Sequence, residues 1–148
     1  ARRGECVVEM IGDGVHLAPA IVLDVFETLG RESVVLVTDA MAAAGMPDGD
    51  YVLGPAAVTV ADGVARLTEG GAIAGGTAHL IDVVRTTWRG GVDLVDAVYA
   101  ASCQGAEILG DRSIGALEPG RWADLVVTDA ELAPVRVLRR GEAVASSL

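Results

Sequence analysis

The sequence predicts an α/β fold in which short, buried, parallel strands are covered by helices. Hydrophobic residues make up 51% of the 148 residues but aromatic residues only 3%, so the core must consist of aliphatic side chains. The apolar segments are short continuous runs, which are typical of strands buried on both faces. A strand-like run, a helical segment and a second strand-like run also follow one another with short links, which is the order of a βαβ unit.

The βαβ unit is expected within the first 39 residues. Its helix has proline in the first turn and glycine just past the last turn, the residues favoured at those positions. The two strands of such a unit are parallel and their connection is right-handed. In chain order, the sequence predicts a buried strand at residues 6–12, a loop at residues 13–16, a helix from Pro19 to Thr28 that ends at Gly30, and a buried strand at residues 34–37.

Residues 51–67 have the pattern of β-hairpins rather than of a helix. Asp62-Gly63 separates two β-like segments, and Asp-Gly between such segments is a strong hairpin signal. We therefore expect a β insertion that ends in the glycine-rich residues 70–76. Its strand-like pieces are residues 51–53, 57–60 and 64–67.

Two helices and several short strands are expected in the remaining residues. Thr77 and Asp93 are suitable N-cap residues, because their side-chain oxygens can accept hydrogen bonds from free backbone N–H groups. In chain order, the sequence predicts a helix at residues 78–88, a helix from residue 94 to Gly110, and short strands at residues 123–129, 135–138 and 142–144.

The composition argues against several classes of function. A net charge of −10 without clustered cations is unsuited to nucleic acid. No run approaches the ~18 apolar residues of a membrane span, and the first residues resemble no signal peptide, so a cytoplasmic protein is expected. Cys6 and Cys103 match no metal or redox spacing and are expected to be buried thiols. The positive mean hydropathy indicates surfaces meant to be covered.

Two polar residues follow the two predicted parallel strands. Asp39 comes directly after the second strand, where parallel α/β folds place ligands and catalytic groups, although an aspartate there can equally cap a turn. His16 comes about four residues after the first strand, and a lone histidine is more often structural. Because consecutive parallel strands end at the same edge, we expect the two side chains to face one pocket.

The glycine run at residues 70–76 is a weaker candidate. It lacks the Gly-Lys-Ser/Thr ending of a P-loop and the Gly-x-Gly-x-x-Gly order after a strand. Its spacing alone predicts a flexible return from the hairpin, although glycines allow a backbone to approach a ligand closely. His79, near the start of a predicted helix, is expected to be a surface or helix-packing residue.

Three segments, in this order, resemble the N-acetylglucosamine-6-phosphate deacetylases of the amidohydrolase superfamily. They are Glu9-Met-Ile-Gly-Asp-Gly-Val-His16, Leu36-Val-Thr-Asp-Ala-Met-Ala-Ala-Ala-Gly-Met-Pro-Asp-Gly49 and Ile73-Ala-Gly-Gly76. The tail at residues 114–127 is similar to a closing segment shared across the superfamily. The resemblance implies the C-terminal part of a (β/α)8, TIM-like, metal-dependent hydrolase barrel. Residues 1–122 would hold its last two strands, the hairpin insertion and the closing helices, and residues 123–148 would return to a small β-sandwich.

The resemblance also implies a reaction, the hydrolysis of the acetamide of N-acetylglucosamine 6-phosphate to glucosamine 6-phosphate and acetate. Asp39 would be the acid/base that takes a proton from metal-bound water and gives it to the departing amine. His16 would polarise or hold the acetamide or the sugar. The remaining residues implied to line the substrate pocket are Asp13, Gly14, Val15, Ile73, Ala74 and Gly75.

The family's divalent metal, zinc or iron, is held by a glutamate and two histidines on earlier strands that this chain lacks. The resemblance therefore assigns no metal ligand here and implies that this chain alone is incomplete and inactive, and that the complete enzyme is a homodimer. A non-catalytic remnant is the alternative from another class. Another amidohydrolase, dihydroorotase-like or cytosine-deaminase-like, would share Asp39 and the tail, but the Val-Thr-Asp-Ala-Met-Ala-Ala-Ala-Gly block at residues 37–45 argues against it.

Overall fold

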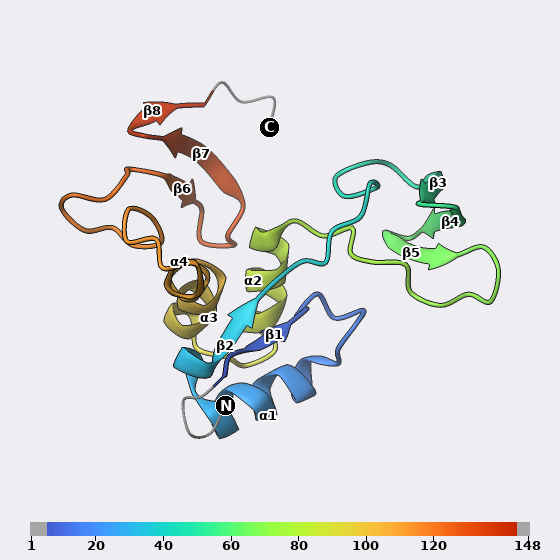
Figure 1. Cartoon of the computed structure of the whole chain (residues 1–148), viewed down its shortest axis with the longest axis horizontal. Coiled ribbons are helices and arrows are strands. Elements are labelled where there is room, and N and C mark those ends of the chain that lie inside the picture. The colour runs from blue at the N-terminus through green and yellow to red at the C-terminus, as the bar shows by residue number, and fades with distance from the viewer. Residues whose placement is uncertain (1–5, 145–148) are drawn as a thin grey trace.

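The computed structural model describes residues 6–144, which form three small sheets and four α-helices (Figure 1). One sheet is a parallel pair, β1-β2, and the other two are three-stranded and antiparallel, β3-β4-β5 and β6-β7-β8. In chain order the elements are β1 (Val8–Met10), α1 (Pro19–Leu29), a 3-10 turn η1 (Arg31–Ser33), β2 (Val34–Leu36), β3 (Gly49–Leu53), β4 (Ala56–Ala61), β5 (Val64–Leu67), α2 (Leu80–Arg89), α3 (Leu94–Ala101), α4 (Cys103–Leu109), β6 (Leu125–Thr128), β7 (Pro134–Arg139) and β8 (Glu142–Ala143).

The βαβ unit predicted from the sequence is confirmed. Strands β1 and β2 pair in parallel with Val8 opposite Val34, and α1 connects them, beginning at the predicted proline. Both strands are shorter than the predicted residues 6–12 and 34–37. Each strand has a single neighbour in the sheet, so the hydrogen-bond ladder ends where the two segments diverge toward their loops.

The main core lies between the β1-β2 pair and helices α1, α2 and α3. It is aliphatic except for one phenylalanine, as the composition predicts, and alanines of α3 allow that helix to approach the strands closely. Full burial of the larger of these side chains, those of Val, Leu, Met and Phe, stabilises a fold by roughly 1.5–3 kcal/mol each. The buried members are Met10, Val22, Phe26, Val34, Leu36, Val83, Val84, Val92, Ala97, Ala100 and Leu132.

The predicted hairpin insertion is confirmed and has its own small core. Asp62 and Gly63 join β4 to β5, and both have positive φ, as the tightest hairpin turns require. The carboxylate of Asp48 accepts hydrogen bonds from both of their backbone N–H groups. The insertion's buried side chains are Met41, Ala43, Val58, Val60, Ala65 and Ala74.

The N-cap of α2 was predicted wrongly. The helix begins at Leu80 rather than at residue 78, and His79, not Thr77, occupies the N-cap position. The backbone N–H of His79 donates to the carboxylate of Asp82 at 3.2 Å, while the hydroxyl of Thr77 donates to the carbonyl of Gly63. The Thr77 side chain is therefore bonded to the hairpin and does not form the helix cap that the local pattern predicts.

The single helix predicted from residue 94 to Gly110 is in fact two. Helix α3 has the predicted N-cap, Asp93, but ends before Ser102, where the backbone leaves the helical region with φ −130° and ψ −68°. The Ser102 hydroxyl donates to the carbonyl of Val98 at 2.8 Å, a local bond that competes with the helical ladder. Helix α4 then begins at Cys103.

The C-terminal sheet lies apart from the β1-β2 pair in the fold (Figure 1). An apolar cavity of about 810 Å³ separates its β6 and β7 strands from α2 and α3. Its lining includes exposed apolar residues, among them Val98, Leu117 and Val126. The assignment of residues 123–148 to a β-sandwich stays a prediction.

The two cysteines, both predicted to be buried, differ in their exposure. Cys6 is exposed rather than buried, because it precedes the short β1. Cys103 is half-buried, and its thiol donates to the carbonyl of Gly115 at 2.8 Å. No helix within residues 6–144 combines the length and the apolar character that crossing a membrane would need.

Candidate active site

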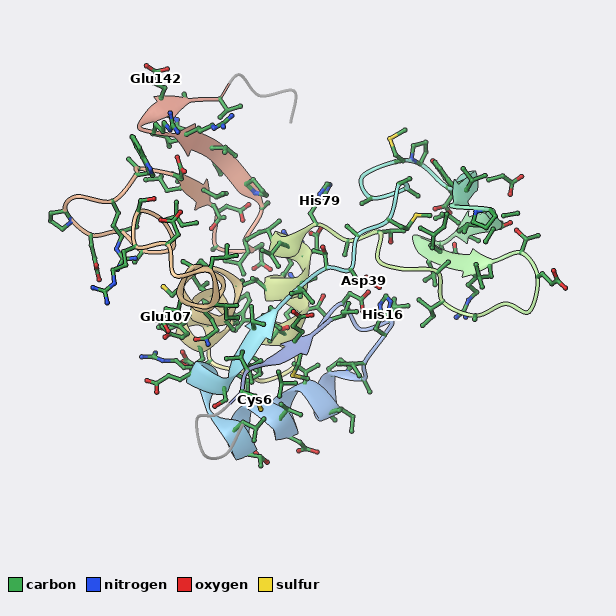
Figure 2. All side chains as sticks on the ribbon, viewed as in Figure 1. Cys6, His16, Asp39, His79, Glu107 and Glu142 are labelled. Atoms are coloured by element: carbon green, nitrogen blue, oxygen red, sulfur yellow. The ribbon has the colours of Figure 1, made fainter. Side chains whose placement is uncertain are left out.

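The loops that follow β1 and β2 emerge at the same end of the parallel pair. The register, with Met10 opposite Leu36, fixes this arrangement, since the carboxyl ends of parallel strands share one edge. His16 belongs to the first loop and Asp39 to the second, and Figure 2 shows both at this end. The topology therefore brings together the two segments that the sequence analysis paired.

Asp39 has an unusual backbone and an unengaged side chain. Its φ is +49°, in the left-handed region that few residues other than glycine, asparagine and aspartate adopt. The residue is exposed, and within residues 6–144 no hydrogen bond or ion pair engages its carboxylate. The interpretation of Asp39 as a turn cap is thereby weakened, because a capping carboxylate would accept a backbone N–H bond.

The glycine-rich segment is held against the backbone of Asp39. The N–H of Gly76 donates to the carbonyl of Asp39 at 2.7 Å, and the carbonyl of Gly76 accepts from the N–H of Met41 at 3.0 Å. A Cβ on Gly76 would lie 2.0 Å from the carbonyl oxygen of Thr38. Residues 73–76 therefore pack against the segment that carries Asp39.

The three pocket residues predicted in this segment differ in what they expose. The methyl group of Ala74 is buried in the hairpin core, and its N–H donates to the carbonyl of Ala65, so its side chain is not available to a ligand. Ile73 is half-buried. Gly75 has φ +96°, and a Cβ there would lie 3.0 Å from the carbonyl oxygen of Asp39. Ile73 and Gly75 are thus half-buried, whereas Ala74 is only 4% exposed.

The loop after β1 is organised by Asp13. One oxygen of its carboxylate accepts hydrogen bonds from the N–H groups of Val15 and His16, both at 2.9 Å, and the other lies 2.8 Å from Nδ1 of His16. Gly14, with φ +80°, allows the tight turn between them. The turn leaves Val15 39% exposed and the His16 side chain 16% exposed.

These contacts change the acidity of Asp13. Burial alone raises the pKa of its carboxyl, but the hydrogen bonds from the His16 backbone, the His16 ring and the Val15 backbone, with the charge attraction of the imidazole, outweigh that effect. The net pKa of Asp13 lies below its ordinary value of 3.8. The carboxylate is therefore ionised at neutral pH.

The depressed pKa of Asp13 predicts a pH dependence of stability. A carboxyl whose pKa is lower in the folded state contributes stability above its unfolded pKa, and this contribution is lost as pH falls through the folded pKa. We expect the free energy of unfolding to decline less in Asp13→Asn than in the wild-type chain below about pH 4. Urea unfolding at a series of pH values measures this difference. The control Asp24→Asn, which removes an exposed carboxylate of α1, should keep the wild-type slope.

The residues present do not form a metal site by themselves. Within residues 6–144, no three His, Cys, Asp or Glu side chains lie together in a group that could hold a metal ion. His79 is exposed at the start of α2, and the ring of His16 faces Asp13 rather than a cluster of ligands. A metal held at this end of the sheet would need ligands from outside the described part of the chain.

A sequence model of the amidohydrolase family matches residues 4–146. The chain belongs to the amidohydrolase family. Among amidohydrolases, it is 38% identical over 141 residues to the N-acetylglucosamine-6-phosphate deacetylase of Vibrio furnissii, a match that covers 94% of this chain and 35% of that protein. It is also 38% identical over 137 residues to the N-acetylgalactosamine-6-phosphate deacetylase of Escherichia coli O157:H7, with 91% and 36% covered.

A solved deacetylase structure is similar over nearly the whole of this chain. The N-acetyl-D-glucosamine-6-phosphate deacetylase of Mycobacterium smegmatis, determined as a mutant in complex with N-acetyl-D-glucosamine-6-phosphate, superposes with a TM-score of 0.88 at 43% identity. The match covers 97% of this chain and 39% of that structure. The predicted resemblance is confirmed, and the chain spans a little over a third of the length of these relatives. The described residues correspond to part of that fold, and the barrel is not closed in this chain.

Neither the close contact made by Gly76 nor the hydrogen bonds made by Asp13 were predicted from the sequence. The pair Gly75-Gly76 is visible in the sequence, but only the structure shows that the second glycine contacts the strand end that carries Asp39. The signal for Asp13 was its spacing of three residues from His16, which allows a side chain to bond both a backbone N–H and a ring.

Proposed function

We propose that this chain supplies the acid/base residue and part of the sugar pocket of an amino-sugar 6-phosphate deacetylase. The reaction is the hydrolysis of N-acetylglucosamine 6-phosphate to glucosamine 6-phosphate and acetate. The observation that carries the proposal is the convergence, at one end of the β1-β2 pair, of the three segments that resemble this family. They are the loop with His16, the strand end with Asp39, and residues 73–76.

Asp39 is proposed to move the proton that amide hydrolysis requires. Water attacks the acetamide carbonyl carbon while Asp39 takes up one of its protons, and the carboxylic acid so formed protonates the nitrogen as the C–N bond breaks. An exposed carboxylate that is not engaged by neighbouring groups suits this role, because both steps need it within reach of a substrate.

His16 and residues 73–75 are proposed to contact the N-acetyl sugar. His16 lies in the loop after β1, at the end of the strand pair where Asp39 also lies, and the backbone of Gly75 lies against Asp39. We propose that each borders the position at which the acetamide reacts. Val15 and Ile73 would supply apolar contacts beside them. The metal expected for the complete enzyme would come with ligands from beyond this chain.

A non-catalytic role is the second candidate. No group of three metal-ligating side chains lies within residues 6–144, and both candidates share this property. In that case, the chain keeps the arrangement of the three segments but catalyses no reaction. The two candidates differ in what happens when the rest of a deacetylase is supplied.

A chimera tests the proposal. The part of the Mycobacterium smegmatis deacetylase that precedes its match to this chain is joined to the 148-residue chain, and acetate release is measured from N-acetylglucosamine 6-phosphate. We expect the chimera to be active and to contain stoichiometric zinc or iron, while the 148-residue chain alone has neither property. Parallel assays with N-acetylgalactosamine 6-phosphate decide between the two sugars named among the relatives.

A well-folded chimera that binds metal but releases no acetate from either sugar would contradict the proposal and support the non-catalytic role. Activity in the 148-residue chain alone, with bound metal, would contradict the view that the site needs residues from elsewhere. A chimera carrying Asp39→Asn serves as the control for contaminating deacetylase.

A further inference from the structure

Asp13 combines burial with several hydrogen bonds. Its side chain is 6% exposed, and its two oxygens engage the backbone of Val15 and both the backbone and the ring of His16. Three bonds converge on one buried carboxylate over four residues of loop. Such an arrangement fixes both the turn and the orientation of the imidazole ring.

The contact with the ring has a chemical consequence. An ionised carboxylate can only accept hydrogen bonds, so the nitrogen that faces it must carry the proton. That nitrogen is Nδ1 of His16, at 2.8 Å from Oδ2 of Asp13. In the neutral ring, Nε2 is then the nitrogen with a free lone pair, and it lies on the side of the ring away from Asp13.

We infer that Asp13 is a positioning residue that fixes His16 in its Nδ1-protonated form and presents Nε2 as a hydrogen-bond acceptor. The part of this inference that concerns substrate binding rests on the proposed function. The matching donor on an N-acetyl sugar is the acetamide N–H or a ring hydroxyl. The depressed pKa of Asp13 agrees with this arrangement, since it keeps the carboxylate ionised.

Replacement of Asp13 by asparagine changes the position of the proton on the His16 ring without changing the shape of the loop. Asparagine has nearly the same shape, and its amide oxygen can still accept the two backbone bonds from Val15 and His16. Its NH₂ group would then face Nδ1 and donate to it, which forces the ring proton to Nε2. The variant therefore keeps the loop while reversing the tautomer.

The test is the ¹⁵N NMR spectrum of the 148-residue chain labelled at histidine, recorded at about pH 8, where an ordinary imidazole is neutral. The chain has two histidines, so His16→Gln identifies the signals. We expect the Nδ1–H tautomer for His16 in the wild-type chain and the Nε2–H tautomer in Asp13→Asn. A wild-type ring protonated at Nε2, or an unchanged tautomer in the variant, would overturn the inference.

Asp48→Asn is the matched control. The Asp48 carboxylate also accepts two backbone N–H bonds, from Asp62 and Gly63, but it lies in the hairpin and faces no histidine. This variant should leave the His16 tautomer unchanged. A tautomer change in Asp48→Asn would show that the effect reports general loss of structure, and would count against Asp13 as its specific cause.

Steady-state kinetics of the chimera test whether Nε2 of His16 binds the substrate. In Asp13→Asn we expect KM to rise about tenfold with a smaller change in kcat, as for the loss of one hydrogen bond to bound substrate. A reversed tautomer with unchanged KM would overturn the role toward the substrate. An inactive wild-type chimera would count against the proposed function alone, because the NMR result on the 148-residue chain decides the tautomer independently.

Discussion

Replacing Asp39 with asparagine is expected to lower the turnover of the chimera about 10²-fold or more, because a general acid/base is lost. Asparagine suits this test for two reasons. It matches the shape of aspartate, and it tolerates the left-handed backbone, φ +49°, that position 39 adopts. The backbone bond from Gly76 should therefore persist, and KM and metal content should stay close to their wild-type values while kcat falls.

The matched control for Asp39→Asn is Glu69→Gln. Glu69 is an exposed carboxylate in the turn after β5, and its replacement removes the same charge from the chain. Steady-state kinetics of acetate release, with metal analysis of each protein, make the comparison. Near-normal turnover in Asp39→Asn would rule out the assigned role, and an equal loss in Glu69→Gln would point to net charge instead.

Gly76→Ala is expected to destabilise the chain by about 1–3 kcal/mol and to lower turnover in the chimera, because the added methyl group has no room. Its Cβ would lie 2.0 Å from the carbonyl oxygen of Thr38, a backbone atom that cannot rotate away. Either residues 73–76 or the end of β2 must move, and the hydrogen bond from Gly76 to Asp39 is lost or stretched. Urea unfolding and kcat measure the two effects.

Gly105→Ala makes the same chemical change in a place with room. Gly105 lies within α4, and a Cβ there meets nothing within 4 Å apart from the helix's own backbone. Alanine is the better helix former by roughly 1 kcal/mol, so this control should stabilise the chain. A Gly76→Ala chain as stable and as active in the chimera as wild type would contradict the close contact between Gly76 and Thr38.

Parts of the fold follow from local pattern. The βαβ unit was predictable because its buried runs, its proline and its terminal glycine each act within a few residues. The turn at Asp62-Gly63 was predictable for the same reason, since the residue pair itself adopts the required positive φ. Asp39 was a candidate from position alone, and the family resemblance gave it a role that the chimera tests.

Other features could not be predicted from the sequence because they depend on contacts between distant segments. Thr77 has the side chain of an N-cap, yet its hydroxyl bonds to Gly63 in the hairpin and leaves the cap position to His79. Ala74 belongs to a predicted substrate loop, and the sequence does not show that its methyl group packs in the core of the hairpin. Ser102 has helical neighbours on both sides, and only its bond to Val98 shows where the helix breaks.

By itself, the sequence determined where the strands lie to within a few residues, which carboxylate follows the second strand, and which family the chain resembles. Those properties are local, since they depend on runs of side chains and on short motifs. Only the tertiary structure decided that Gly76 fits against the backbone beside Asp39 and that Asp13 holds the ring of His16. Both depend on distances of a few ångströms between atoms whose approach is set by packing and by hydrogen-bond geometry, which no pattern along the chain encodes.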